Sequence, residues 1–336
     1  MADLRTTYLG LELRSPIVAS AGPLTGTLAT LHQLEQAGVA AVVLPSLFEE
    51  EVVTESMHLN DVLDQGADWT PEASSFFPDM DFSDLGPERH VKLVERAKAS
   101  IGIPVIASVN ATSPGVWARY AAMMVDAGAD AIELNVYAVP GDPAHDAASV
   151  EARYLDAIRE VRAEVQVPLA VKLSPYFSSA GHFAMQAVAA GADGLVLFNR
   201  FLQPDIDPET LTVTVRPGLS AQAEGRLPRS WIALLAGRLR ASLAATTGVE
   251  TAADVAKYLL AGADVVMTAS ALLRHGPGYA GVLLDELSAW MARKGFRSVA
   301  EVRGLLAVPD GTDQAAYERA GYVTALDEAN KGYAPW

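Results

Sequence analysis

One short phrase that recurs along the chain constrains its fold more than any other feature. Ala-Gly-Ala-Asp occurs at residues 127–130, 190–193 and 261–264, and a looser copy, Ala-Gly-Val-Ala, lies at residues 37–40. Each copy leads into a short apolar run, a pattern typical of a helix end, a glycine cap and a buried strand. Repeated helix–turn–strand units predict parallel strands, because each crossover returns the chain to the same end of a sheet.

Eight apolar segments have the length and composition of strands. They span residues 16–20, 41–44, 104–109, 131–135, 168–173, 194–198, 242–246 and 265–268. Most are continuous apolar runs, as expected for strands that are covered on both faces. Amphipathic segments at residues 115–127, 149–165 and 251–261 lie between them. This alternation predicts a (β/α)8 TIM barrel, an α/β fold. An open doubly wound sheet is the alternative, but no G-x-G-x-x-G follows the first strand.

The length fits one large domain with insertions as well as it fits two small domains. The 336 residues are 50% hydrophobic, which suffices for a large core. We expect a single domain over residues 1–336, with the barrel at about 9–294 and a C-terminal extension at 295–336. Two stretches interrupt the alternation, at residues 50–87 after the second strand and 201–229 after the sixth. Long insertions after barrel strands are usually lids or binding loops.

Charge and cysteine content exclude several classes of function. The formal net charge of −16 argues against nucleic-acid binding, which needs a basic face. The chain has no cysteine, so it cannot itself hold an iron–sulfur cluster, a thiolate metal site or a cysteine nucleophile. The histidines show no metal-ligand spacing, and no metal is expected. No apolar stretch reaches membrane-spanning length and no signal peptide is visible, so we expect a cytoplasmic protein.

Lys172 is the most informative single residue. It lies within Leu169–Leu173, an otherwise apolar predicted strand. A buried lysine is costly unless its ammonium group meets an anion or a polar cavity. It would pair with Glu133 on the neighbouring strand, contact a ligand, or act as a Schiff-base amine, and these roles can coexist. Because barrel active sites lie at strand ends, a ligand-binding or catalytic role is favoured.

Other polar residues follow the predicted strands. Thr247 and Gly248 join the seventh strand to a helix, and Ala269-Ser270 follows the eighth. Barrels commonly hold a phosphate here through backbone N–H groups. An ordinary turn between a strand and a helix would have the same sequence pattern. Asn135 and Asn199 end the fourth and sixth strands and could bind a ring edge or form local turns. Arg200 could clamp a carboxylate or pair with a surface acid.

Together these residues resemble the dihydroorotate dehydrogenase family, and in particular its FMN-dependent class 1 type. The likeness runs from Leu9 to about Gly278, opening with Leu9-Gly10-Leu11, Ser15-Pro16 and Ser20-Ala21-Gly22, a segment that lies over the flavin in the family. Further matches are Glu133-Leu134-Asn135, Val171-Lys172-Leu173-Ser174-Pro175, Phe198-Asn199, Gly218-Leu219-Ser220, Thr247-Gly248-Val249 and Ala269-Ser270. The resemblance implies FMN as cofactor, a small-molecule substrate and a homodimer. The residues implied to contact FMN are Ser20, Ala21, Gly22, Ser46, Asn110, Asn135, Lys172, Asn199, Gly218, Thr247, Gly248, Ala269 and Ser270, with Asn199 and Arg200 facing the substrate.

The chain departs from the family where the catalytic base is expected. The family carries a cysteine or serine three residues after the asparagine, and here that position is Ala138. The early Lys-Thr pair is replaced by Pro45-Ser46, and a substrate-binding asparagine by Pro140. These departures resemble a divergent, dihydroorotate dehydrogenase-like branch. Tyr137 is the nearest candidate base, so Tyr137 and Lys172 are the predicted catalytic residues, with His145 and Asp146 as more distant candidates.

Three hypotheses of function follow. The leading one is an FMN-dependent oxidoreductase that acts on a CH–CH bond of a small polar substrate, with dihydroorotate as the family's substrate. The second is a Schiff-base lyase or aldolase that uses Lys172. The third is a flavin-binding redox subunit that does not turn over dihydroorotate itself but exchanges electrons with an external partner, which would have to carry any iron–sulfur cluster.

Overall fold

A closed barrel of parallel strands forms the centre of the molecule. The computed structural model describes residues 2–50, 87–110, 115–136, 141–200, 204–214 and 218–332. The barrel strands are β3 (Ile17–Ala19), β4 (Ala41–Val43), β6 (Val105–Asn110), β7 (Ala131–Asn135), β8 (Leu169–Leu173), β9 (Gly194–Leu197), β12 (Ser242–Ala245) and β13 (Val265–Thr268). They pair in this order, and pairing of β13 with β3 closes the ring. The predicted (β/α)8 barrel and its strands are therefore confirmed.

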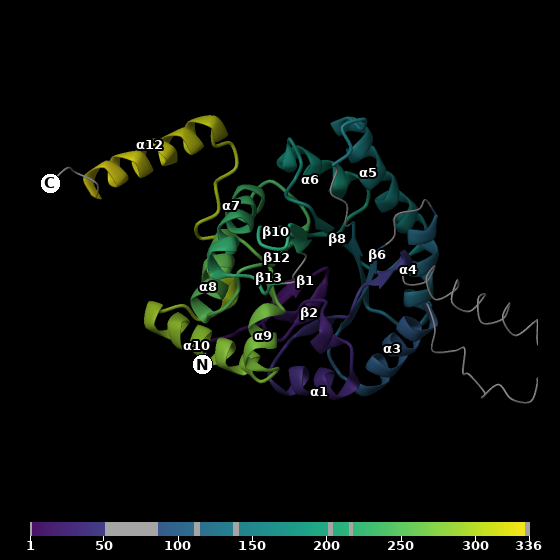
Figure 1. The fold of residues 1–336 in the computed structure, drawn as a ribbon. Coiled ribbons are helices and arrows are strands. Elements are labelled where there is room, and N and C mark those ends of the chain that lie inside the picture. The colour runs from purple at the N-terminus through teal and green to yellow at the C-terminus, as the bar shows by residue number, and fades with distance from the viewer. Residues whose placement is uncertain are drawn as a thin grey trace, which may run out of the picture.

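Helices surround the strands (Figure 1). Their bounds are α1 (Leu28–Gln36), α3 (Pro87–Ser100), α4 (Val116–Asp126), α5 (Ala147–Glu164), α6 (Ala180–Ala189), α7 (Arg226–Leu235), α8 (Ala252–Ala261), α9 (Ser270–His275) and α10 (Tyr279–Lys294). The predicted helices at 115–127, 149–165 and 251–261 correspond to α4, α5 and α8. Each helix buries an apolar stripe against the barrel, such as Phe183 and Ala187 on α6.

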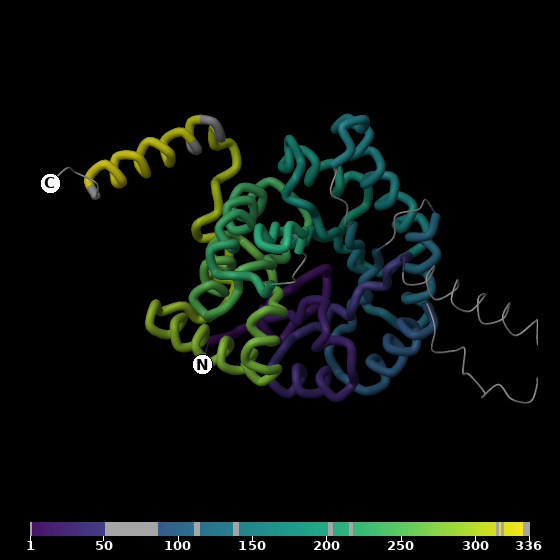
Figure 2. The backbone as a smooth tube through the Cα atoms, viewed as in Figure 1, coloured from purple at the N-terminus to yellow at the C-terminus, as the bar shows by residue number. Residues whose placement is uncertain are grey.

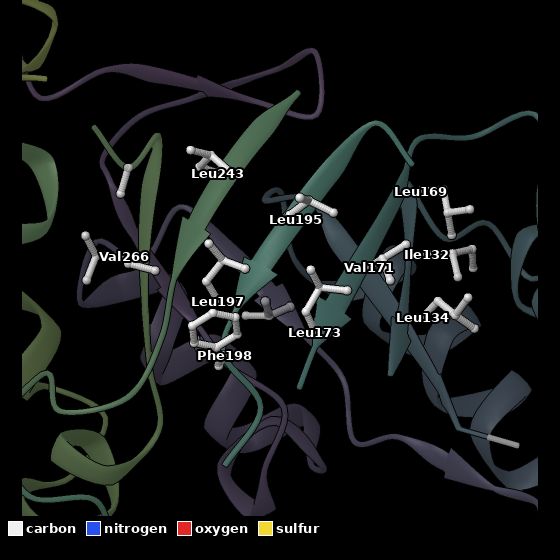
Figure 3. Packing of buried hydrophobic residues seen from close by; sticks show 14 of the residues in the cluster. Ile132, Leu134, Leu169, Val171, Leu173, Leu195, Leu197, Phe198, Leu243 and Val266 are labelled. Atoms are coloured by element: carbon white, nitrogen blue, oxygen red, sulfur yellow. The ribbon is translucent and has the colours of Figure 1, made fainter. Parts of the chain in front are cut away.

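Alternation along the strands separates two apolar layers. Outward residues such as Ile132, Val171 and Leu195 belong to the cluster between strands and helices, and Figure 3 shows them on neighbouring strands. Inward residues such as Ala170 and Val196 belong to the cluster inside the barrel. Because successive side chains of a strand point to opposite faces, this parity directs polar residues at alternate positions into the barrel.

The recurring Ala-Gly-Ala-Asp phrase ends helices as predicted, and its aspartate has a further role. The glycines at 128, 191 and 262 have positive φ values of 99°, 119° and 116°. The following aspartates each accept a hydrogen bond from the backbone N–H at or near the start of the adjoining barrel strand. The pairs are Asp130 with Val105 at 2.7 Å, Asp193 with Leu169 at 2.8 Å and Asp264 with Leu243 at 2.7 Å. The phrase therefore also ties the N-terminal ends of neighbouring strands together.

A hairpin closes the N-terminal end of the barrel. β1 (Thr6–Tyr8) pairs antiparallel with β2 (Leu11–Leu13). Tyr8, Leu9 and Leu13 are buried in the cluster inside the barrel, and the N–H of Leu9 donates to Ser242 Oγ at 3.0 Å. The expectation that Leu9-Gly10-Leu11 lies over the ligand is therefore wrong. Leu9 and Gly10 both have positive φ and form the hairpin turn, which brings the apolar side chains into the barrel end opposite the site.

The two predicted insertions differ in what the structure describes. Residues 51–86 lie outside the described part of the chain. Within the second insertion, β10 (Asp205–Asp207) pairs with β11 (Thr212–Thr214), and a short 3-10 helix (Gln222–Gly225) leads into α7. The sequence predicts that this insertion runs to residue 229, but α7 begins at Arg226, so the insertion ends about one helical turn earlier than predicted. Pro228 had suggested a loop, but proline is tolerated in the first turn of a helix.

The C-terminal extension divides into two parts. α11 (Val299–Val302) and the segment after it pack on the barrel, with Val299, Val302 and Val308 buried. α12 (Gln314–Gly332) extends away from the ring of helices, as the yellow end of the tube in Figure 2 shows.

Candidate functional site

Two connected cavities lie at the carboxyl ends of the barrel strands. The outer cavity has a volume of about 1000 Å³ and the inner one about 180 Å³. Residues common to both linings are Ala21, Lys172, Asn199 and Arg200. Ligand pockets usually span about 300–1000 Å³. The site is therefore large enough for a cofactor together with a substrate.

Lys172 stands at the junction of the two cavities. On β8 it alternates with the outward residues Val171 and Leu173, so its side chain points into the barrel. Its Nζ lies 3.2 Å from Oε1 of Glu133, which is fully buried on the neighbouring β7. Lys172 therefore pairs with Glu133 and also lines both cavities, two roles that the sequence analysis left open side by side.

Beneath this pair, Tyr8 enters the barrel from the hairpin. Its hydroxyl and the second carboxylate oxygen of Glu133 have no hydrogen-bond partner within the described residues. Burial, with the negative charge of Glu133 as the second cause, raises the pKa of Tyr8 well above its usual value. The hydroxyl therefore stays protonated. Among the described residues, Lys172 is the cation that pairs with Glu133.

A chain of polar side chains crosses the rim of the barrel. The hydroxyls of Ser46 and Ser108 lie 2.7 Å apart, and Asn135 Nδ2 donates to Ser46 Oγ at 3.5 Å. Asn199 Nδ2 donates to Asn135 Oδ1 at 2.5 Å. The structure therefore brings together Ser46, Asn135 and Asn199, which the sequence singled out separately. Fixed amides of this kind can present donors and acceptors to a heterocyclic ring.

The turn after β12 borders the inner cavity and has an unusual backbone conformation. Thr247 and Gly248 have φ values of 76° and 71°, and a non-glycine residue in this region is strained. Buried Tyr258 holds the turn, since its hydroxyl donates to the Thr247 carbonyl at 2.6 Å. Ser20, Ala269 and Ser270 join these two residues around the inner cavity. Backbone N–H groups that converge on a small polar cavity can hold a phosphate.

Arg200 is held by groups of the second insertion. Its Nε lies 2.9 Å from Glu224 Oε1, and its Nη1 donates to the carbonyl of Gly218. Burial by itself raises the pKa of Glu224, but hydrogen bonds from Arg200 and the Ala221 N–H outweigh it and lower that pKa. Arg200 thus lines both cavities while paired with a nearby acid. Gly218 takes part through its carbonyl and does not line either cavity.

Other predicted residues lie outside the cavities or outside the described chain. Asn110 ends β6, is buried, and lines neither cavity, and its Nδ2 has no hydrogen-bond partner in the described part. Tyr137 and Ala138 fall among the residues that the structure does not describe. Asp146 caps α5 by accepting from Ser149 N–H at 2.8 Å, and the exposed His145 lies near Asp142.

The sequence analysis missed a row of basic residues on α3. Arg89, Lys92 and Arg96 line the outer cavity, together with Phe48 and Leu93. Their spacing places them on one face of a helix, which is a signal that the sequence contains. It was overlooked because α3 follows the long insertion and was not itself predicted.

Among the described residues, no group of His, Asp or Glu side chains is arranged to hold a metal ion. No helix in the described ranges is both long and apolar enough to cross a membrane.

A parallel barrel with its polar cavities at the carboxyl ends of the strands has the architecture of a barrel enzyme. A sequence profile described as Dihydroorotate dehydrogenase matches residues 76–291, and the chain belongs to that family. It is accordingly an oxidoreductase of the class that acts on CH–CH donors.

Relatives with assigned functions match over most of their length. A protein of Methanothermobacter thermautotrophicus is 30% identical over 317 residues, covering 90% of this chain and 98% of that protein. One of Thermoplasma acidophilum is 26% identical over 311 residues, covering 91% and 99%. One of Methanosarcina acetivorans is 27% identical over 301 residues, covering 88% and 94%. Each is described as dihydroorotate dehydrogenase B (NAD(+)), catalytic subunit.

Proposed function

We propose that the protein is an FMN-dependent oxidoreductase that oxidises a CH–CH bond of a small polar substrate, and that dihydroorotate is the substrate to test first. The observation that carries the proposal is the place of Lys172. Its ammonium group lies where an inner cavity suited to an anion meets an outer cavity with room for rings. Family membership supports the same reaction class.

The residues present fit FMN. Thr247, Gly248, Ala269 and Ser270 surround the inner cavity and would hold the phosphate, largely through backbone N–H groups. Asn135, Asn199 and Lys172 line the outer cavity with Ala21 and Gly22 and would hold the ring. When bound, FMN would supply the ring that takes up a hydride equivalent from the substrate. A cation at Lys172 would stabilise the negative charge that then develops near it.

Oxidation of a CH–CH bond also releases a proton, which needs an acceptor. The family's cysteine or serine position is Ala138 here, and alanine cannot take a proton. We propose Tyr137 as the acceptor, because it is the adjacent titratable residue in the same segment. A tyrosine with a pKa near 10 needs a neighbouring cation to act as a base at neutral pH. Lys172 and Arg200 both line the site and are the candidate cations.

A partner protein would complete the electron path. The cited relatives are described as catalytic subunits, which supports an external redox partner for this chain. Because the chain has no cysteine, any iron–sulfur relay must belong to that partner. We also propose a homodimer, on the family resemblance.

The visible spectrum of the purified protein tests the proposal. We expect absorbance near 450 nm from bound flavin, and loss of that absorbance when dihydroorotate is added without oxygen. A yellow protein that does not bleach would reject dihydroorotate but keep FMN. A colourless protein that also fails to take up added FMN would overturn the proposal. Trapping of a carbonyl compound on Lys172 by borohydride would then identify the Schiff-base alternative.

The Tyr137→Phe variant extends the same measurement to the proton acceptor. With flavin content unchanged, we expect bleaching to slow by about 100-fold or more, in the range reported for loss of a general base. Unchanged bleaching would exclude Tyr137 from that role.

A further inference from the structure

The outer cavity has a charge opposite to that of the protein. The chain carries 41 acidic and 25 basic side chains. Among the described residues, however, no Asp or Glu lines this cavity. Its basic lining residues are Arg89, Lys92, Arg96, Lys172 and Arg200. A cavity lined by one sign of charge attracts ligands of the other sign, and here it would draw an anion toward an otherwise acidic protein.

The basic row on α3 lies far from the anion site at the Thr247-Gly248 turn. α3 precedes β6, whereas the turn follows β12. Around the barrel, three strands lie between β6 and β12 in either direction, so the two sites face each other across the mouth. The residues of α3 line only the outer cavity, and those of the turn only the inner one. An FMN phosphate at the turn therefore does not account for the cations on α3.

The charges of the outer cavity also differ in how they are balanced. Lys172 pairs with Glu133, and Arg200 pairs with Glu224. For Arg89 and Arg96, the described residues supply no carboxylate within ion-pair distance. Arginine side chains at the mouth of a cavity can bind an oxyanion with two parallel N–H donors. Within the described ranges, these two arginines are therefore available to a ligand.

We propose that the substrate carries an oxyanion group, a carboxylate or a phosphate, which Arg89 and Arg96 bind at the mouth of the outer cavity, as a second anion site besides the one proposed at the turn. The proposal rests on the proposed function, in which the flavin ring and the oxidised bond occupy the deeper part near Lys172. The substrate would then be larger than dihydroorotate, which serves in the spectral test as the family's compound for the reaction class, and it would bear an anionic group at its outer end. Lys92, on the same face of α3, would add to the positive potential.

Calorimetric titration of the full chain in the presence of saturating FMN tests this inference. Citrate and pyrophosphate serve as separate probes, and they distinguish a carboxylate site from a phosphate site. The test variant is Arg89→Gln with Arg96→Gln. The control variant is Arg293→Gln with Lys294→Gln, which makes the same change in net charge on the exposed end of α10, outside both cavities.

We expect at least one probe to bind wild type and to bind the α3 variant at least tenfold more weakly. The control should lose less than twofold, since its charges are screened at moderate ionic strength. Equal losses in both variants, no loss in the α3 variant, or no binding of either probe would overturn the inference. The flavin spectrum, recorded on the same samples, reports the proposed function separately. Yellow protein with unchanged probe binding rejects only the second anion site, whereas colourless protein rejects the cofactor.

Discussion

Asp254 is a buried carboxylate that organises the start of α8 beside the site. It is 2% exposed and accepts hydrogen bonds from Gln222 Nε2 at 2.8 Å and Thr251 Oγ1 at 2.9 Å. Lys257 Nζ lies 3.2 Å from its other oxygen. Burial by itself raises the pKa of Asp254, but these donors together outweigh it and lower that pKa. Asp254 thus caps the first turn of α8 and also links α8 to the second insertion.

Asp254→Asn should destabilise the protein in a pH-dependent way. A carboxylate whose pKa is lowered in the folded state stabilises the fold above its unfolded pKa of about 3.9, and that stability is lost as the pH falls through the folded value. We expect a loss of about 1–3 kcal/mol at pH 7. The difference from wild type should shrink below about pH 4. Urea unfolding across pH measures both, with exposed Asp285→Asn as a control that should change by under about 0.5 kcal/mol. A loss that is constant with pH would contradict this account.

At the same scale, the sequence located Lys172 but not its whole environment. An isolated lysine in an apolar strand is visible in one dimension, because it breaks the pattern. Its pairing with Glu133 was foreseen, since both lie on neighbouring predicted strands. The approach of Tyr8 to Glu133 from the opposite end of the barrel was not foreseen. No local sequence pattern relates a residue at position 8 to the side chains of β7 that point into the barrel. Whether Tyr137 acts on a substrate stays a prediction.

The turn between β12 and α8 is the element on which the proposed cofactor binding depends. Two consecutive residues with positive φ bend the chain around the inner cavity. A Cβ at Gly248 would overlap the backbone N of Gly225, so the short 3-10 helix packs directly against the turn. The second insertion and the proposed phosphate site are therefore in direct contact.

Gly248→Ala should damage both stability and flavin binding. The strain of positive φ costs about 1–3 kcal/mol, and the overlap with Gly225 adds to it. Gly295→Ala is the matched control, because Gly295 has a φ of 81° but its Cβ would meet nothing within 4 Å. We expect the control to lose about 1 kcal/mol and retain full flavin content. Thermal unfolding and the visible absorbance report the two effects. Equal losses in the two variants would show that strain alone matters at Gly248.

Elements differed in how far the sequence could predict them. Long apolar strands and helices between them were identified because their periodicity is a local signal. The β10–β11 hairpin was not, since its strands are short and exposed and carry little apolar pattern. α3 was missed for another reason. Its outer face is strongly charged, and only the closed barrel shows that part of this face lines a cavity.

On the scale of the whole molecule, the barrel depends on part of the C-terminal extension. The N–H groups of Gly304 and Val308 donate to carbonyls of α8 and α7 at 2.9 Å and 2.8 Å. Val299 and Val302 are buried in the main core. The described side chains of α12, by contrast, are exposed along its length. The expected extension at 295–336 is therefore two segments with different relations to the barrel.

Truncation at two points should separate these segments. Ending the chain after Thr312 removes α12, and we expect Tm to change by less than about 2 °C, because little surface is uncovered. Ending it after Gly295 removes three buried valines, each worth about 1.5 kcal/mol or more, and uncovers the barrel surface beneath them, so Tm should fall by about 10 °C or the protein should aggregate. Differential scanning calorimetry of the two truncated chains measures both changes in Tm. A large fall in Tm when the chain ends after Thr312 would show that α12 makes stabilising contacts of its own.

The hairpin at the closed end of the barrel also sets an order for biosynthesis. Leu9 bonds to a serine 233 residues further along the chain, and Thr6 to a carbonyl 258 residues away. At about 5–20 residues per second, a ribosome needs roughly 12–50 s to supply those partners. Tyr8, Leu9 and Leu13 leave the exit tunnel long before these partners and are among the last residues to reach their native contacts. The nascent chain therefore carries this apolar segment uncovered during most of its synthesis, where a chaperone would bind it.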